Sequence, residues 1–190
     1  MEKQVIDSFR GENRFLSNFW LVNIFYEGRF YPSVEHAYQA SKSDREEVRE
    51  KISNLEKPSD AKQLGKELEL LKQIRLDWND VFRLEVMQSL VQQKFCIDNS
   101  ELVEKLLSTE WTELIEGNTW DDIFWGVCNG KGDNHLGKIL MNVRSSLFKS
   151  KVVAQSLLNQ IKGDKAKVAF LMGITEQKLN KMIQTFKLNA

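Results

Sequence analysis

The chain contains little of what stabilises small secreted or metal-dependent proteins. Its 190 residues include only two cysteines, two prolines and two histidines. Two cysteines are too few for a disulfide framework, which indicates a reducing compartment. The histidines, His36 and His135, lie far apart, and neither belongs to an HExxH or CxxC spacing. The pattern therefore predicts no metal site, and we expect a protein that works without a metal or redox cofactor.

Long apolar runs are also missing. No stretch approaches the roughly 20 apolar residues that a membrane helix needs. The amino-terminal sequence MEKQVIDSFR is charged and lacks the apolar segment of a signal peptide. Hydrophobic residues make up 42% of the chain and charged residues 28%, which permits a packed core and argues against wholesale disorder. We therefore expect a cytoplasmic protein without membrane association.

Charge is unevenly distributed, although the formal net charge is zero. Residues 151–190 carry seven lysines and two acidic residues, whereas residues 1–150 carry 20 basic and 25 acidic residues. An acidic body with a basic tail predicts a domain over 1–150 and a separate helical tail over 151–190. Both a polyanion partner and a merely soluble lysine-rich helix fit this distribution.

Hydrophobic periodicity and turn residues predict an α+β fold, a compact and mostly helical domain with a few short strands and a small C-terminal helical appendage. Aromatic and β-branched residues over 22–26 and 29–31 flank Glu27-Gly28, which predicts a β-hairpin. Ser33 is a suitable N-cap for a helix over 34–43. Asp77 and Asn134 can each cap a further helix, and other helices are expected near 64–71 and 100–108. A strand is expected over 112–115 and a loop over 117–133.

The helix after Ser33 places Glu35, Gln39 and Lys42 in a narrow polar stripe. Taken alone, such a stripe is typical of a solvated helix face. The alternative is that a carboxylate, an amide and an ammonium project into one cleft. The spacing does not decide between these two interpretations.

A second group of polar and aromatic residues lies between Glu116 and Asn134. It combines acidic side chains with Trp120 and Trp125 and ends in glycines ahead of a helix. Tryptophans offer stacking faces for a base, and a glycine-rich helix start offers N–H groups to a phosphate. Carboxylates can protonate a leaving nitrogen or stabilise an oxocarbenium-like ribosyl cation. The alternative is that the tryptophans are core residues and the glycines form turns.

Several short sequence blocks follow one another in a distinctive order. They are FLSNF at 15–19, YPSVEHAYQASK at 31–42, DW at 77–78, KF at 94–95, LIEGN at 114–118, DIFWG at 122–126 and NHLGKILM at 134–141, with Arg144. These blocks resemble the NADAR (YbiA-like) family and stand in that family's order. The resemblance covers about residues 9–148, and it implies a compact α+β domain that hydrolyses N-glycosidic bonds.

The resemblance also implies substrates and site residues. Two substrate classes are associated with the family: phosphorylated ribosylamino-pyrimidine intermediates of riboflavin synthesis, and ADP-ribose attached to a nucleobase such as guanine in DNA. A non-catalytic ADP-ribose or nucleotide reader is a further alternative. By position, Glu35 and Asp122 are the catalytic candidates, and Lys42 would contact a phosphate or tune Glu35. The substrate-binding candidates are Asn18, Lys42, Trp78, Trp125, Gly126 and Asn134.

The basic tail resembles a Fis-type helix-turn-helix. Gly173-Ile174 forms the turn, Thr175 is a suitable N-cap, and the candidate recognition helix covers 176–187. Its polar side chains suit phosphates and base edges, although the tail contains no arginine. A packing or dimerisation appendage is the alternative to DNA contact, and the oligomeric state stays open. The candidate DNA-binding residues are Gln177, Lys178 and Lys181.

Overall fold

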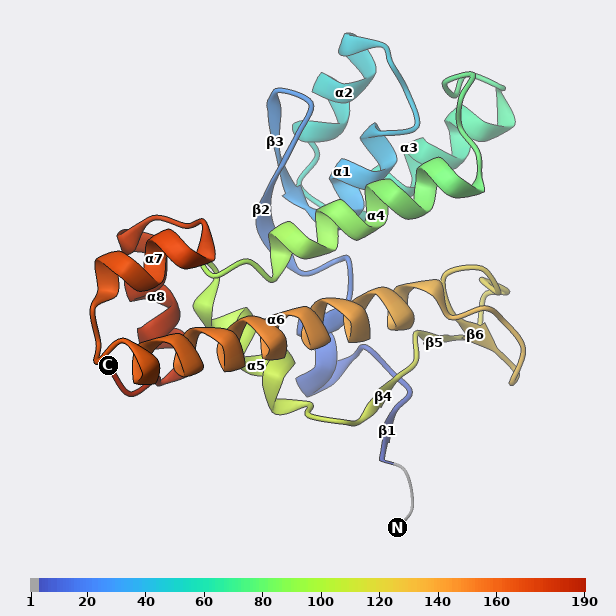
Figure 1. Ribbon diagram of the computed structural model, residues 1–190. Helices are drawn as coiled ribbons and strands as arrows, with labels where there is room; N and C mark the ends of the chain where they lie inside the picture. The colour runs from blue at the N-terminus through green and yellow to red at the C-terminus, as the bar shows by residue number, and fades with distance from the viewer. Residues whose placement is uncertain (1–3) are drawn as a thin grey trace. The chain divides into compact units, whose positions relative to one another are not determined.

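The computed structural model describes residues 4–190 (Figure 1), which form two compact units. Unit 1 comprises the chain up to Lys94 together with Glu113–Leu140, and unit 2 comprises Phe95–Thr112 together with Met141–Ala190. The chain is mostly helical with a few short strands, so the predicted α+β class is confirmed. Within residues 4–190, no helix has both the length and the apolar character needed to cross a bilayer.

Unit 1 contains three two-stranded sheets and the helices that surround them. The hairpin of β2 and β3 is antiparallel, whereas β1 pairs with β4 and β5 with β6 in parallel. The predicted hairpin is therefore confirmed, with its turn at Glu27-Gly28. The elements are β1 (Val5–Ile6), the 3-10 helix η1 (Gly11–Leu16), β2 (Leu21–Tyr26), β3 (Arg29–Ser33), α1 (Val34–Ala40), α2 (Glu46–Ser53), α3 (Pro58–Leu70), α4 (Asp80–Lys94), β4 (Glu113–Leu114), β5 (Gly117–Asn118), β6 (Val127–Cys128) and the start of α6 (His135–Gln160).

Helix α1 lies at the centre of unit 1, in contact with the hairpin and with α2, α3 and α4. Ser33 caps it as predicted, because its hydroxyl accepts a hydrogen bond from the N–H of His36. Every residue of α1 is buried, so the interpretation of its polar stripe as a solvated face is wrong. Helix α3 approaches closely at Gly65, where a Cβ atom would lie 1.8 Å from Gln39 Oε1.

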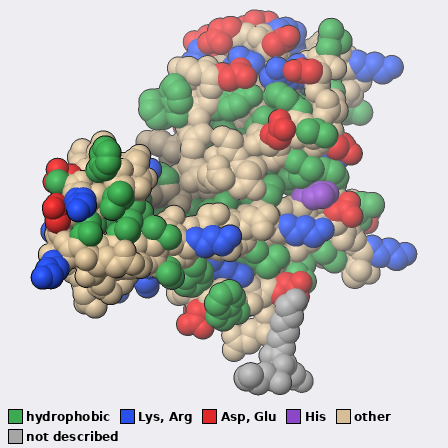
Figure 2. Space-filling model, viewed as in Figure 1, with side chains coloured by type: hydrophobic (Ala, Val, Ile, Leu, Met, Phe, Trp, Pro, Cys, Tyr) green, Lys and Arg blue, Asp and Glu red, His purple; other side chains and the backbone are tan. Residues whose placement is uncertain are grey.

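Acidic and basic side chains are interspersed over the part of unit 1 that carries α2 (Figure 2). One of the ion pairs in this region joins Arg29 of the hairpin to Glu46 at the start of α2. Exposed pairs of this kind contribute only about 0–1 kcal/mol each, so the position of α2 depends more on its buried apolar side, which includes Val48 and Ile52.

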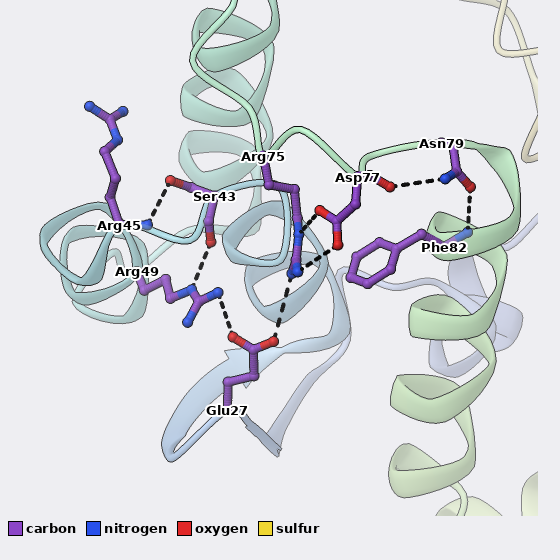
Figure 3. A network of polar contacts seen from close by, with 8 residues as sticks. All are labelled: Glu27, Ser43, Arg45, Arg49, Arg75, Asp77, Asn79 and Phe82. Carbon is purple, nitrogen blue, oxygen red and sulfur yellow. Dashed lines mark hydrogen bonds and ion pairs between the residues drawn. The ribbon is translucent and has the colours of Figure 1, made fainter.

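A denser polar network fixes the tip of the hairpin (Figure 3). Glu27 in the turn pairs with Arg49 of α2 and with Arg75, whose guanidinium also binds Asp77. This pairing corrects the prediction that Asp77 caps α4. The side chain of Asn79 caps α4 instead, because its Oδ1 accepts a hydrogen bond of 3.0 Å from the N–H of Phe82.

Unit 2 consists of α5 (Ser100–Ser108), the remainder of α6, α7 (Lys165–Met172) and α8 (Glu176–Phe186). The predicted turn between the last two helices is confirmed: Gly173 adopts a left-handed conformation with φ of 64°, and Thr175 caps α8. Val103 of α5 and Leu158 of α6 belong to the same core as Leu179 of α8. Residues 151–190 thus share a core with α5, and the predicted boundary at residue 150 lies inside α6.

The first turn of α6 provides a test of how closely unit 1 is packed. A Cβ atom on Gly137 would lie 2.1 Å from the carbonyl oxygen of Leu114. Gly137→Ala should therefore lower the free energy of unfolding by roughly 1–3 kcal/mol, although alanine has the higher helix propensity. Urea unfolding measures this loss, with Lys138→Ala at an exposed position of the same helix as control. Equal stability of the two variants would contradict the close approach.

Candidate functional site

A cavity of about 360 Å³ lies within unit 1. Its walls come from η1 and the residues after it, from α1 and α3, from the segment between β4 and β6, and from the start of α6. Carboxylates, cations and aromatic rings all face it. The carboxylates are Glu35, Glu116 and Asp122, the cations are Arg10, Arg14 and Lys62, and the aromatic side chains are Phe9, Phe19, Trp120 and Trp125.

Glu35 lies in the first turn of α1, where its N–H donates to the carbonyl of Asn18 at 3.1 Å. Its Oε1 accepts a hydrogen bond of 2.7 Å from Gln39 Nε2. Burial raises the pKa of Glu35 above its ordinary value, and this effect outweighs the opposing effects of Gln39, Lys62 and Lys42. In its ionised form this side chain is therefore a stronger base than a carboxylate in water.

Asp122 is held by the turn that it begins. Its Oδ1 accepts a hydrogen bond of 2.9 Å from the N–H of Trp125. Asn118 binds the backbone of Asp122 on both sides, accepting from its N–H at 3.1 Å and donating to its carbonyl at 2.8 Å. The structure therefore brings the two predicted catalytic carboxylates, from stretches 87 positions apart in the sequence, to one cavity.

The N-terminus of α6 is already occupied by the chain itself. The N–H groups of residues 133–136 donate to the carbonyl oxygens of residues 123–126, over distances of 2.7 to 3.3 Å. These four donors are therefore not available to a ligand. This corrects the expectation of a phosphate site at this glycine-rich helix start. Gly126 and Gly132 serve close backbone packing instead, because a Cβ atom on either would lie 2.1 or 2.2 Å from a backbone carbonyl oxygen.

Asn134 and Gly126 act behind the cavity wall. Asn134 Oδ1 accepts from the N–H of Glu116 at 3.1 Å, and its Nδ2 donates to the carbonyl of Leu114 at 2.9 Å. A Cβ atom on Gly126 would lie 2.1 Å from the carbonyl oxygen of Glu116. Neither residue lines the cavity, contrary to the sequence prediction, but both fix the backbone of Glu116.

Lys42 and Trp78 also lie away from the cavity wall. Lys42 is buried and pairs with Glu69, with 2.7 Å between Nζ and Oε1. Trp78 packs on the ring of Tyr38, whose other neighbour is Trp125 at 5.3 Å between ring centroids. Of its two predicted roles, Lys42 therefore keeps the electrostatic effect on the pKa of Glu35 and loses the contact with a substrate phosphate. Through Tyr38, Trp78 supports Trp125, one of the two tryptophans that line the cavity.

Asn18 lines the cavity as predicted. Its Nδ2 approaches Met87 Sδ at 3.4 Å, and its Oδ1 is buried with no hydrogen-bond partner among the described residues. A buried amide oxygen without a donor costs free energy. Asn18 is therefore available to bind a ligand that enters the cavity.

Several residues that face the cavity were missed by sequence reasoning. Glu116 stood in a quoted block, but nothing in the sequence told it from the neighbouring carboxylates. Arg10 of the segment before η1 and Lys62 of α3 belong to no motif. Their side chains lie 5.9 and 5.4 Å from the ring centroid of Trp120. Only tertiary packing brings these positions together.

The remaining predicted residues lie on α8 of unit 2. Gln177 and Lys178 are exposed on its first turn, whereas Lys181 forms an ion pair with Asp98. The structure thus confirms the helices of the tail, and DNA contact through these side chains stays a prediction. Among residues 4–190, no group of His, Cys, Asp or Glu side chains is arranged to hold a metal ion.

These features define an α+β domain with a carboxylate-lined cavity that has basic and aromatic walls. Residues 7–148 match the family described as NADAR domain, and the chain belongs to that family. The resemblance found in the sequence blocks is therefore confirmed.

Relatives of known name are similar over most of this chain. A riboflavin biosynthesis protein of Vibrio vulnificus is 42% identical over 134 residues, which cover 70% of this chain but only 35% of that protein. N-glycosidase YbiA of Escherichia coli is 36% identical over 132 residues, which cover 69% of this chain and 79% of YbiA. The NMR structure of E. coli YbiA superimposes with a TM-score of 0.67 at 30% identity, covering 80% of this chain and 89% of that one.

Proposed function

We propose that this protein is a hydrolase of N-glycosyl compounds that cleaves the bond between a ribose carbon and a nitrogen. Its proposed substrate is a phosphorylated ribosyl compound, such as a ribosylamino-pyrimidine intermediate of riboflavin biosynthesis. The observation that carries the proposal is the convergence of Glu35 and Asp122 in one cavity beside Trp125. The names of the relatives, an N-glycosidase and a riboflavin biosynthesis protein, support it.

Cleavage of an N-glycosidic bond builds positive charge on the ribose ring, so nearby carboxylates stabilise the transition state. Asp122, oriented by the N–H of Trp125, stabilises that cation. Glu35 takes a proton from the attacking water, because burial makes its carboxylate a stronger base. Trp125 contacts the flat heterocycle, and Asn18 binds a polar group of the substrate.

The phosphate of the substrate is bound by side chains in this proposal. Arg10, Arg14 and Lys62 line the same cavity as the carboxylates, and Arg10 and Arg14 are exposed. Guanidinium groups bind phosphate oxygens through paired hydrogen bonds. In this proposal the anionic group binds at the cavity rim, and the sugar–nitrogen bond lies near Glu35 and Asp122.

The catalytic assignment is tested by isosteric substitution. Glu35→Gln and Asp122→Asn should each lower kcat by at least about 100-fold while the fold survives, because each removes a negative charge that the transition state uses. Chromatography of the base freed from the riboflavin intermediates measures kcat. Glu85→Gln and Asp44→Asn, both at exposed positions, are the matched controls. Normal turnover in both Glu35→Gln and Asp122→Asn would rule out these roles.

A second candidate substrate is ADP-ribose attached to guanine, and an adjoining cavity favours it. This cavity of about 470 Å³ shares Phe19, Lys62 and Trp120 with the first one and adds Lys66. Trp120 is 47% exposed and offers a stacking face for a second heterocycle. Two adjoining cavities with shared walls suit a substrate with two nucleotide halves.

The two substrate classes are separated by Lys66, which borders only the adjoining cavity of the two. If the larger substrate is correct, Lys66→Ala should lower kcat/KM for ADP-ribosylated guanosine about tenfold, the usual loss of one charged hydrogen bond, and leave the riboflavin intermediates unaffected. Lys57→Ala, exposed just before α3, is the control. Equal effects on both substrates would argue against the second candidate. A non-catalytic reader would bind ADP-ribose and release no base from either substrate.

We propose separately that α8 contacts DNA. The observation in favour is the excess of lysines over acidic residues in 151–190, together with the exposed positions of Gln177 and Lys178 at the start of the helix. Side chains at this end of a recognition helix are the ones that reach base edges and phosphates.

The double substitution Gln177→Glu and Lys178→Glu tests DNA contact. It should weaken binding to duplex DNA, and the slope of log affinity against log salt should become shallower by about one for the lysine lost. Fluorescence anisotropy at several salt concentrations measures both quantities. Lys149→Glu, which reverses the charge of one exposed lysine on α6, is the control. Retention on DNA equal to that of the wild type would refute the proposal.

A further inference from the structure

Glu116 is a third carboxylate in the cavity, and the mechanism above gives it no role. It lies between β4 and β5 on a backbone that is fixed on both sides. Its N–H donates to Asn134 Oδ1 at 3.1 Å, and its carbonyl accepts from the N–H of Val127 at 2.9 Å. The side chain lines the cavity together with Glu35 and Asp122. Its position is therefore as well defined as theirs.

The three carboxylates differ in their hydrogen bonds. Glu35 accepts from Gln39, and Asp122 accepts from a backbone N–H. Glu116 Oε2 is buried, and no residue among 4–190 donates a hydrogen bond to it. An ionised oxygen in that position is unfavourable, whereas a protonated one can donate to a ligand. The local geometry thus favours the acid form of Glu116.

Burial and the charges that face Glu116 together also favour its acid form. Burial raises the pKa of Glu116 to about 7, and the negative charges of Asp122 and Glu35 add to the effect, against Lys62 and Lys94. At neutral pH a large fraction of Glu116 therefore carries a proton. A carboxyl group that holds a proton at neutral pH can serve as the general acid that acid–base catalysis requires.

We propose that Glu116 is the general acid that protonates the departing nitrogen, an inference that rests on the proposed N-glycosidase function. The bond between the ribose C1′ and the nitrogen breaks, and its electron pair goes to the nitrogen. The proton on Glu116 moves to that nitrogen, which leaves Glu116 as a carboxylate. Water then adds to C1′ and gives a proton to Glu35. Exchange with solvent returns Glu116 to its acid form and Glu35 to its base form.

The first test is the pH profile of kcat/KM for wild type and Glu116→Gln. Wild-type activity should fall as pH rises through about 7, because the group must hold its proton to act as an acid. Glu116→Gln should be slower by at least about 100-fold and should lack that fall. Glu85→Gln is the control. Wild-type kcat in Glu116→Gln, or persistence of the alkaline fall, would overturn the proposal.

The second test varies the leaving group among N-ribosides that the wild type cleaves. Less basic leaving groups need less protonation, so the loss caused by Glu116→Gln should shrink as their basicity falls. A loss that is uniform across the series would indicate a structural role and overturn the proposal. If the wild type releases no base from any riboside, the proposed function fails. If Glu35→Gln and Asp122→Asn are inactive while Glu116→Gln is not, only this inference fails.

A stability measurement keeps the test independent of activity. A carboxyl whose pKa is raised by folding destabilises the folded state as pH rises towards that pKa and beyond. Glu116→Gln removes this titration, so its stability relative to wild type should be greater at pH 8 than at pH 5. A difference that does not change with pH would show that Glu116 titrates normally, and would contradict the proposal.

Discussion

Helix α1 is covered by the hairpin and by α2, α3 and α4, and the chemistry of the cavity depends on that burial. A buried carboxylate loses several kcal/mol of solvation unless donors and cations replace the water. For Glu35 the replacements are Gln39, Lys62 and Lys42. Layers of structure that never touch a ligand therefore help to set the basicity of this side chain. The ion pairs of Glu27 at the hairpin tip belong to those layers.

The second constraint is the contact between residues 123–126 and the start of α6. The first N–H groups of a helix have no partner within the helix and usually bind a capping side chain or an anion. Here they bind backbone carbonyls, and the turn so formed presents Asp122 and Trp125 to the cavity. The positive charges that face the cavity consequently belong to the side chains of Arg10, Arg14 and Lys62. The N–H groups at the start of α6 thus bind the protein's own backbone.

Local patterns were predictable from the sequence, and long-range placement was not. The hairpin at Glu27-Gly28 and the caps Ser33 and Thr175 depend on nearest neighbours along the chain, and all three are confirmed. Asp77 fails as a cap because Arg75 competes for its carboxylate.

The candidate site shows the same division. Glu35 and Asp122 were found through resemblance to a family, since no periodicity links positions so far apart. Lys42 was misplaced because its partner, Glu69, comes from another helix. Lys62 and Glu116 were missed because only tertiary packing, and no sequence pattern, distinguishes them from the other charged residues of the chain.

Helix α6 crosses the end of the family match, which limits how the chain can be recombined with its relatives. The family match ends at residue 148, yet α6 continues to Gln160 and supplies Ala154 and Leu158 to the core of unit 2. Val103, well inside the match, belongs to that same core. Recombination at residue 148 would replace the segment that packs against α5 with one from another protein. Exchange of the tail between relatives therefore keeps the core of unit 2 intact only if Phe95–Thr112 and Met141–Ala190 remain compatible.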